Sequence, residues 1–182
     1  MSDIQLNLLI PDHRAVILPD DIDDLVVVEL SRQLLQMAEA SSDPVTIYIA
    51  SNGGDALMSL SIIDLIGLLQ TKYHIEVIGL VLGQAMSGAA FILQACDTRI
   101  ALPNSIIMLH GPSGVTVGDA RSLDAETQLT TKLRDIFLRL LVRKTATFSN
   151  YWEKVLMDSV PKYYTAQEAL TAGLVDVVLS TS

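Results

Sequence analysis

The chain has 182 residues, of which half are hydrophobic and 18% are charged, so it can bury a sizeable core and is not a disordered protein. Its formal net charge of −9 argues against a surface that binds nucleic acid. Cys96 is the single cysteine, which excludes an internal disulfide framework and a zinc site built from several cysteines. We therefore expect one domain over residues 1–182, no cofactor or metal, and a reducing, cytoplasmic location. The mean hydropathy of +0.41 is high for a soluble monomer and predicts contact with other subunits.

The predicted elements alternate between strands and helices along the chain. Short β-branched or apolar runs predict strands, and amphipathic or small-residue stretches between them predict helices. The predicted strands are 15–18, 45–50, 75–82, 99–102, 106–109 and 175–179. The predicted helices are 22–40, 56–69, 87–96, a long one from about 119 to 157, and 165–172. This order predicts an α/β fold with buried, largely parallel strands.

One uncharged run could be mistaken for a membrane span. Residues 77–96 carry no charge over twenty positions, which is long enough to cross a bilayer. Gln84, Ser87 and three glycines interrupt this run, so a buried strand, a tight turn at residues 83–86 and a buried helix explain it better. We therefore expect no association with a membrane. The N-terminus carries an early acid and lacks a basic region, so it does not read as a secretory signal.

Two strand-to-helix turns are candidate parts of a site. Glycines in the sequences SNGG, at 51–54, and GQAMS, at 83–87, let backbone N–H groups approach a ligand closely. Neither turn has the lysine ending of a phosphate-binding loop, so a nucleotide site is not expected. The pattern instead favours an oxyanion hole with N–H donors near Gly54 and Gly88.

Ser87 opens the helix that follows the second turn. It could simply cap that helix, or it could be a nucleophile if a base lies nearby. His13 and His74 precede strands and are expected to be solvated. His110 ends a predicted strand, where it would face the crevice at the sheet edge, so the sequence favours a pairing of Ser87 with His110.

At these positions the sequence resembles the Clp protease proteolytic subunit family of self-compartmentalising serine peptidases. The resemblance covers about residues 13–179 and is carried by the segments VTIYIASNGG, IGLVLGQAMSGAAFIL, RIALPNSIIMLHGPSG and YTAQEALTAGLVDVVL. It implies Ser87 as nucleophile, His110 as general base, and Gly54 and Gly88 as the oxyanion donors. It also implies a crotonase-like spiral of parallel strands and helices, with a protruding helical handle at about 119–157.

The third catalytic residue departs from the family pattern. Counting back from the matched Tyr164 without a gap, the usual aspartate position falls on Pro161, which cannot orient an imidazole. Asp158 is the nearest carboxylate and could serve if the loop is rearranged; otherwise a backbone carbonyl or water would orient His110. The family's charged residues that link catalysis to ring assembly are also missing at this point. The dozen residues before the first strand leave little room for the family's axial loops.

The expected function is ATP-independent cleavage of peptides and unfolded proteins inside a chamber of stacked rings. The resemblance implies a homo-oligomer of heptameric rings, a tetradecamer, with a separate AAA+ unfoldase as partner. The stretch GPSGVTVG, at 111–118, would hold the peptide in an extended form. One alternative is a catalytically weak or silent ring subunit, and another is an acyl-CoA-binding enzyme of the crotonase type.

The long helix carries an apolar stripe that bears on assembly. Its members are Leu133, Ile136, Phe137, Leu140 and Leu141. The family resemblance implies that this helix interleaves with its counterpart in the facing ring. The alternative is packing against the chain's own core.

Overall fold

The computed structural model describes residues 12–112 and 119–179. Its helices are η2 (Asp12–Arg14, a 3-10 turn), α1 (Asp24–Ala40), α2 (Ala56–Lys72), α3 (Gly88–Ala95), α4 (Ala120–Lys144), α5 (Ser149–Met157) and α6 (Ala166–Ala172). Its strands are β1 (Ala15–Leu18), β2 (Asp21–Ile22), β3 (Val45–Ser51), β4 (Gly53–Gly54), β5 (Val77–Met86), β6 (Thr98–Ala101), β7 (Ile106–Leu109), β8 (Lys162–Thr165) and β9 (Val177–Val178).

Seven strands form one mostly parallel sheet. The order β1-β3-β5-β6-β9 is parallel throughout, and β7 pairs in parallel with β5 and antiparallel with β8. β2 and β4 form a separate parallel pair beside it. The predicted α/β class with a largely parallel sheet is confirmed, and the sheet and its helices agree with the fold of the implied family.

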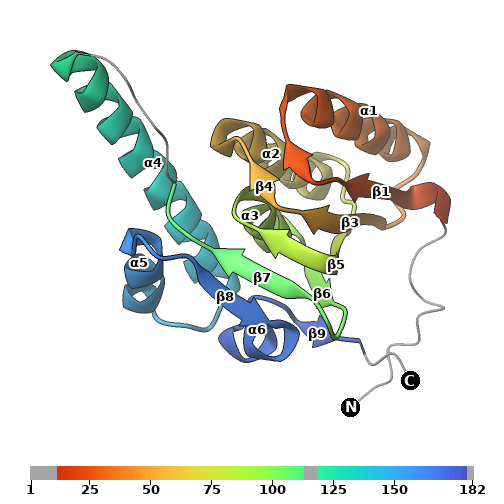
Figure 1. The fold of residues 1–182 in the computed structure, drawn as a ribbon. Coiled ribbons are helices and arrows are strands. Elements are labelled where there is room, and N and C mark those ends of the chain that lie inside the picture. Colours follow the sequence, from red (N-terminus) through yellow and green to blue (C-terminus); the bar gives the residue numbers. More distant parts are fainter. Residues whose placement is uncertain (1–11, 113–118, 180–182) are drawn as a thin grey trace.

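Four helices pack against one another in chain order, and the first three, α1, α2 and α3, also contact strands of the sheet. α1 packs on α2, α2 on α3, and α3 on α4. Apolar side chains of these helices join those of the central strands in the main core, where the rings of Phe91 and Phe137 stack with centroids 4.1 Å apart. Figure 1 shows the N-terminal half of α4 projecting beyond the body of the molecule, as expected for a handle.

The handle is shorter than predicted. The expected single helix to residue 157 is wrong at its C-terminal end, because α4 stops at Lys144 and α5 begins at Ser149. Thr145 ends α4 with an extended backbone, and its hydroxyl accepts a 2.7 Å hydrogen bond from the buried Trp152 indole. β-branched threonine has weak helix propensity, and this tertiary bond stabilises the break.

The predicted turn at residues 83–86 is also wrong, because β5 continues through it to Met86. The pairing between β3 and β5 shifts here: Ile49 lies opposite Val81, whereas Ser51 lies opposite Ala85. Gly83 has φ of 78°, a conformation that glycine adopts at little cost. The bulge transfers the end of β5 from its neighbour β6 to β7.

The uncharged run at 77–96 is divided between β5 and α3, as expected. No helix within 12–112 or 119–179 is long and apolar enough to cross a membrane.

Candidate active site

Ser87 lies in a sharp turn between β5 and α3. Its backbone has φ of 52° and ψ of −122°, a region that residues with a Cβ atom rarely occupy. Although Ser87 stands at the N-cap position, its side chain makes no capping hydrogen bond, so the simple capping role is excluded. Strain of this kind at a polar side chain is typical of functional turns, including the strand-to-helix turns of serine hydrolases.

The ladder between β5 and β7 determines where His110 lies. Met86 is the register partner of Met108, and the N–H of Ser87 donates a 2.9 Å hydrogen bond to the Met108 carbonyl. His110 follows two residues later, directly after the end of β7. The bulge in β5 therefore brings the two predicted catalytic side chains to the same edge of the sheet.

The SNGG turn packs directly on the turn that contains Ser87. Gly53 has φ of 96°, and a Cβ atom placed there would lie 2.6 Å from the Met86 carbonyl oxygen and 2.8 Å from the Ser87 Cβ. Only glycine allows this approach. The contact places Gly54, the next residue, at the edge of the same cavity.

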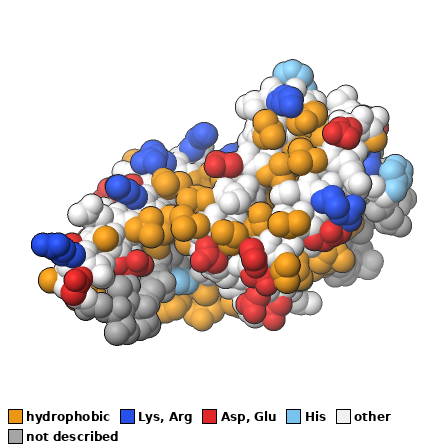
Figure 2. Space-filling view, turned by 90° about the horizontal axis from the view of Figure 1, so that it is seen from above, with side chains coloured by type: hydrophobic (Ala, Val, Ile, Leu, Met, Phe, Trp, Pro, Cys, Tyr) orange, Lys and Arg blue, Asp and Glu red, His pale blue; other side chains and the backbone are white. Residues whose placement is uncertain are grey.

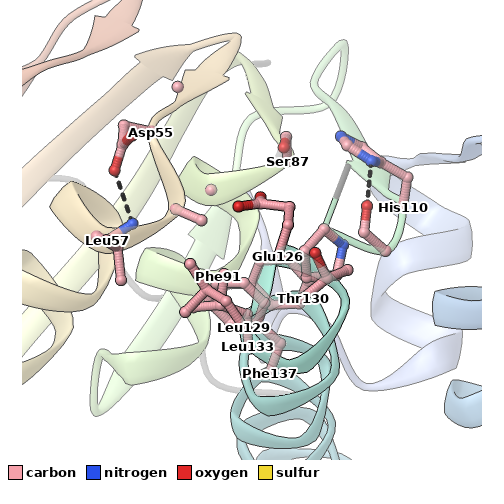
Figure 3. Close-up of a pocket in the computed structure, with 15 residues that line it drawn as sticks. Asp55, Leu57, Ser87, Phe91, His110, Glu126, Leu129, Thr130, Leu133 and Phe137 are labelled. Carbon is pink, nitrogen blue, oxygen red and sulfur yellow. Dashed lines mark hydrogen bonds between the residues drawn. The ribbon is translucent and has the colours of Figure 1, made fainter. Parts of the chain in front are cut away.

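A cavity of about 350 Å³ joins these parts. Ser87, His110, Gly54 and Gly88, the predicted nucleophile, base and oxyanion donors, all line it. Figure 3 shows Ser87 and His110 at its upper rim and the side chains of α3 and α4 below them. The structure thus brings four of the five predicted site residues to one cavity.

The helix that begins at Gly88 supplies free N–H donors. At the start of α2, Asp55 accepts hydrogen bonds from the N–H groups of Leu57 and Met58, at 2.8 and 2.9 Å, so that helix is capped by its own chain. Figure 3 shows the bond to Leu57. In α3 the uncapped first turn leaves the Gly88 N–H without an intrahelical acceptor. The partial positive charge of this helix end favours an anion at the cavity.

His110 is oriented by the backbone. Its Nδ1 lies 2.6 Å from the carbonyl oxygen of Gly111, which can only accept. Nδ1 therefore carries the proton, and Nε2 is left with a lone pair for accepting one. A Cβ atom at Gly111 would lie 2.1 Å from the Leu156 carbonyl oxygen, so α5 holds this residue in place.

Asp158 lies near His110 without bonding it. Both residues line a neighbouring cavity of about 490 Å³, together with Pro161. Asp158 is exposed at the end of α5, and its Oδ1 accepts a 3.0 Å hydrogen bond from the Val160 N–H. Within the described residues, no carboxylate is hydrogen-bonded to His110.

Sequence reasoning missed the apolar and acidic lining that α3 and α4 contribute to the cavity. Its members are Phe91, Glu126, Leu129, Thr130, Leu133 and Phe137. The apolar stripe of α4 is visible in the sequence. The sequence alone leaves open whether the stripe contacts another subunit or packs against the chain's own core. The structure divides the stripe: Leu133, Phe137 and Leu141 are buried in the chain's own core, whereas Ile136 and Leu140 are half-buried in a groove between α2 and α4. No comparable signal distinguished Glu126 from the solvated acids of the same helix.

Two predictions concern residues outside those that the structure describes. The peptide-binding role expected of 111–118 falls mainly on 113–118, and the reduced axial loops fall on 1–11. No cluster of three or more metal-ligating side chains occurs in the part of the chain that the structure describes.

Comparison with known proteins identifies the family. The family model described as Clp protease matches residues 2–182. The chain belongs to the Clp protease family. It is 33% identical over 176 residues to the ATP-dependent Clp protease proteolytic subunit of Ostreococcus tauri, a match that covers 93% of this chain and 83% of that protein. It is 32% identical over 173 residues to proteolytic subunit 3 of Synechococcus sp. strain CC9902, covering 92% and 83%.

A third relative agrees with these two. Proteolytic subunit 2 of the ATP-dependent Clp protease of Gluconobacter oxydans strain 621H is 30% identical over 174 residues, covering 94% of this chain and 76% of that protein. The resemblance found in the sequence is confirmed. Family membership supports a ClpP-like peptidase.

Proposed function

We propose that the chain is a serine endopeptidase subunit that cleaves peptides and unfolded proteins by an acyl-enzyme mechanism without using ATP itself. The observation that carries the proposal is the strained, uncapped Ser87 in one cavity with His110 and two glycine turns. The strained backbone at Ser87 costs stability, and its side chain makes no capping hydrogen bond that would offset this cost. A catalytic role explains why a serine is kept in this conformation.

The first chemical step uses the free lone pair on His110. Nε2 takes the proton from the Ser87 hydroxyl as the oxygen attacks the carbonyl carbon of the peptide. The carbonyl oxygen becomes an oxyanion, which accepts hydrogen bonds from the backbone N–H groups at Gly88 and Gly54. His110 then gives the proton to the leaving amine, and water releases the acyl group by the reverse sequence.

The Gly111 carbonyl is the partner that the geometry offers for the protonated imidazole. It accepts from Nδ1 at 2.6 Å and fixes the tautomer, as a triad aspartate does elsewhere. A neutral carbonyl stabilises the imidazolium less than a carboxylate does, so this arrangement predicts slow turnover. Asp158 could still serve as the third catalytic member if the loop 158–161 moves it to Nδ1.

Assembly into stacked rings is part of the proposal. Large hydrophobic side chains are exposed on α1, α2 and α4, namely Leu25, Val28, Leu57, Leu68, Leu123, Leu129 and Val142. Figure 2 shows hydrophobic side chains gathered between charged ones over one face of the molecule. A smaller apolar cluster around Leu80 and Ile100 includes side chains that are only partly buried in the single chain.

Exposed apolar surface of this kind supports contact with other subunits. Heptameric rings, a cytoplasmic location and an AAA+ unfoldase as partner remain proposals that rest on family membership.

A silent ring subunit is the second candidate. It is favoured by the missing hydrogen bond between His110 and any carboxylate of the described residues. Labelling with a fluorophosphonate probe separates the two candidates, because only an activated serine reacts.

We expect wild type to be labelled at Ser87, Ser87→Ala to be unlabelled, and Ser61→Ala, on the exposed side of α2, to be labelled like wild type. A wild-type protein that assembles but stays unlabelled would support the silent subunit. Sedimentation at micromolar concentration tests the rings, because a 19.8 kDa species there contradicts them.

A further inference from the structure

The catalytic cavity contains an acid that the proposed mechanism does not use. Glu126 lies on α4 and lines the cavity together with Ser87 and His110. Figure 3 shows its side chain rising from α4 into the space below Ser87. The other acid of the cavity, Asp55, is engaged by two N–H groups, whereas Glu126 forms no hydrogen bond or ion pair with any residue of 12–112 or 119–179.

Below Glu126 the cavity is apolar. Its walls there are formed by Phe91, Leu129, Leu133 and Phe137. Phe91, Leu133 and Phe137 are buried, and the rings of the two phenylalanines stack on each other. A narrow apolar slot with one half-buried carboxylate fits a side chain that has a hydrocarbon stem and a cationic end, such as lysine or arginine.

The cavity supplies no cation of its own to Glu126. Its lining contains neither lysine nor arginine. Arg134, two turns further along α4, lines the neighbouring cavity and forms no ion pair with Glu126. The described part of this chain supplies no complementary charge to this carboxylate, and a cationic molecule that enters the cavity can supply it.

The position of Glu126 also affects the chemical step. A carboxylate that shares a cavity with the oxyanion hole opposes the negative charge that develops on the carbonyl oxygen. A cationic substrate side chain paired with Glu126 removes this opposition. The oxyanion is then no longer repelled by an unpaired carboxylate, so the cationic side chain should raise kcat as well as lower KM.

We propose that Glu126 makes the enzyme select peptides with lysine or arginine on the amino side of the cleaved bond. The inference rests on the proposed function, because it uses the Ser87 attack to place that substrate side chain in the slot. Glu126 would act as a specificity residue that touches the substrate.

Three fluorogenic peptides that differ at one position test the proposal. That residue is lysine, norleucine (the same chain length without charge) or glutamate, each next to the cleaved bond. We expect the wild-type kcat/KM for lysine to exceed that for norleucine about tenfold, the size of one charge-assisted hydrogen bond. Glu126→Gln should bring this ratio to about one while norleucine cleavage is retained. Glu126→Lys should favour the glutamate peptide.

Asp124→Asn is the matched control, because Asp124 is an exposed acid of the same helix that lines none of the described cavities. It should leave the lysine-to-norleucine ratio at the wild-type value. A wild-type ratio near one, or a ratio that Glu126→Gln does not change, overturns the proposal. Loss of all cleavage in both Glu126→Gln and Glu126→Lys would assign Glu126 to folding or catalysis and would also overturn it.

Labelling of Ser87 by a fluorophosphonate separates this test from that of the proposed function. If Ser87 is labelled and the norleucine peptide is cleaved, the proposed function stands whatever the ratio shows. If wild type is neither labelled nor active on any peptide, the proposed function fails and the selection by Glu126 fails with it.

Discussion

Replacing the nucleophile by glycine should stabilise the protein while abolishing its activity. Ser87 has φ of 52° and ψ of −122°, and holding a residue with a Cβ atom in such a region costs about 1–3 kcal/mol. Glycine avoids that cost, although its greater freedom in the unfolded chain destabilises the folded state by about 0.5–1 kcal/mol. The lost hydroxyl makes no capping hydrogen bond. The free energy of unfolding should therefore rise by about 1 kcal/mol, which raises Tm by about 2–4 °C for a chain of this size.

Ser87→Ala is the matched control for this prediction. It removes the same hydroxyl but keeps the Cβ atom and hence the backbone strain, so its stability should stay near that of wild type. Urea unfolding of the three proteins at one fixed concentration measures the difference, because assembly would make the midpoint concentration-dependent. If Ser87→Gly unfolds at the same urea concentration as Ser87→Ala, or at a lower one, with unchanged m, the strain argument is wrong.

Two further predictions concern the surroundings of the site. Asp158→Asn should change kcat less than threefold if the backbone carbonyl orients His110, whereas a fall of orders of magnitude in peptide turnover would restore Asp158 as the third catalytic residue. Gly88→Ala should lower the free energy of unfolding by about 1–3 kcal/mol, because the new Cβ would lie 2.2 Å from the Ser59 hydroxyl oxygen. In a double-mutant cycle, Ser59→Ala should recover part of that loss.

Burial raises the pKa of Asp176, but hydrogen bonds from the buried Arg99 outweigh this effect. They hold the pKa of the Asp176 carboxyl below the ordinary aspartate value of 3.8. This carboxylate therefore adds stability above its unfolded pKa, and the contribution is lost as pH falls through the lower folded value. Because the Asp176 side chain is 40% exposed, Asp176→Asn should be less stable than wild type by only about 1 kcal/mol at pH 7. In urea titrations at several pH values, this gap should narrow as the pH falls below about 4.

The sequence alone determined the fold class and a set of candidate site residues. β-branched runs separated by amphipathic stretches predict buried parallel strands. The helices that connect such strands cover both faces of the sheet, so the strands are apolar on both sides. Glycine pairs at strand ends predict close backbone approaches. A serine and a histidine at the ends of two strands are candidates for a shared site at one edge of the sheet. Ser87, His110, Gly54 and Gly88 were proposed as site residues on these grounds, and the structure places all four around one cavity.

The tertiary structure decided how these residues meet. Local patterns could not show that β5 continues past Gly83, because that stretch reads as a turn until β7 is present to pair with it. The same limit applies to the end of α4, where a hydrogen bond from Trp152 stabilises the break at Thr145. Both features depend on partners distant in the sequence.

The roles of the acidic residues depend most on distant contacts. Asp158 and Glu126 are both charged residues on or beside helices that look solvated in the sequence. Only the packing of α4 against α3 brings Glu126 into the catalytic cavity, and only the register of β7 with β8 places the loop of Asp158 beside His110. A carboxylate acts through the groups within a few ångströms of it, and those neighbours come from four different elements of the chain.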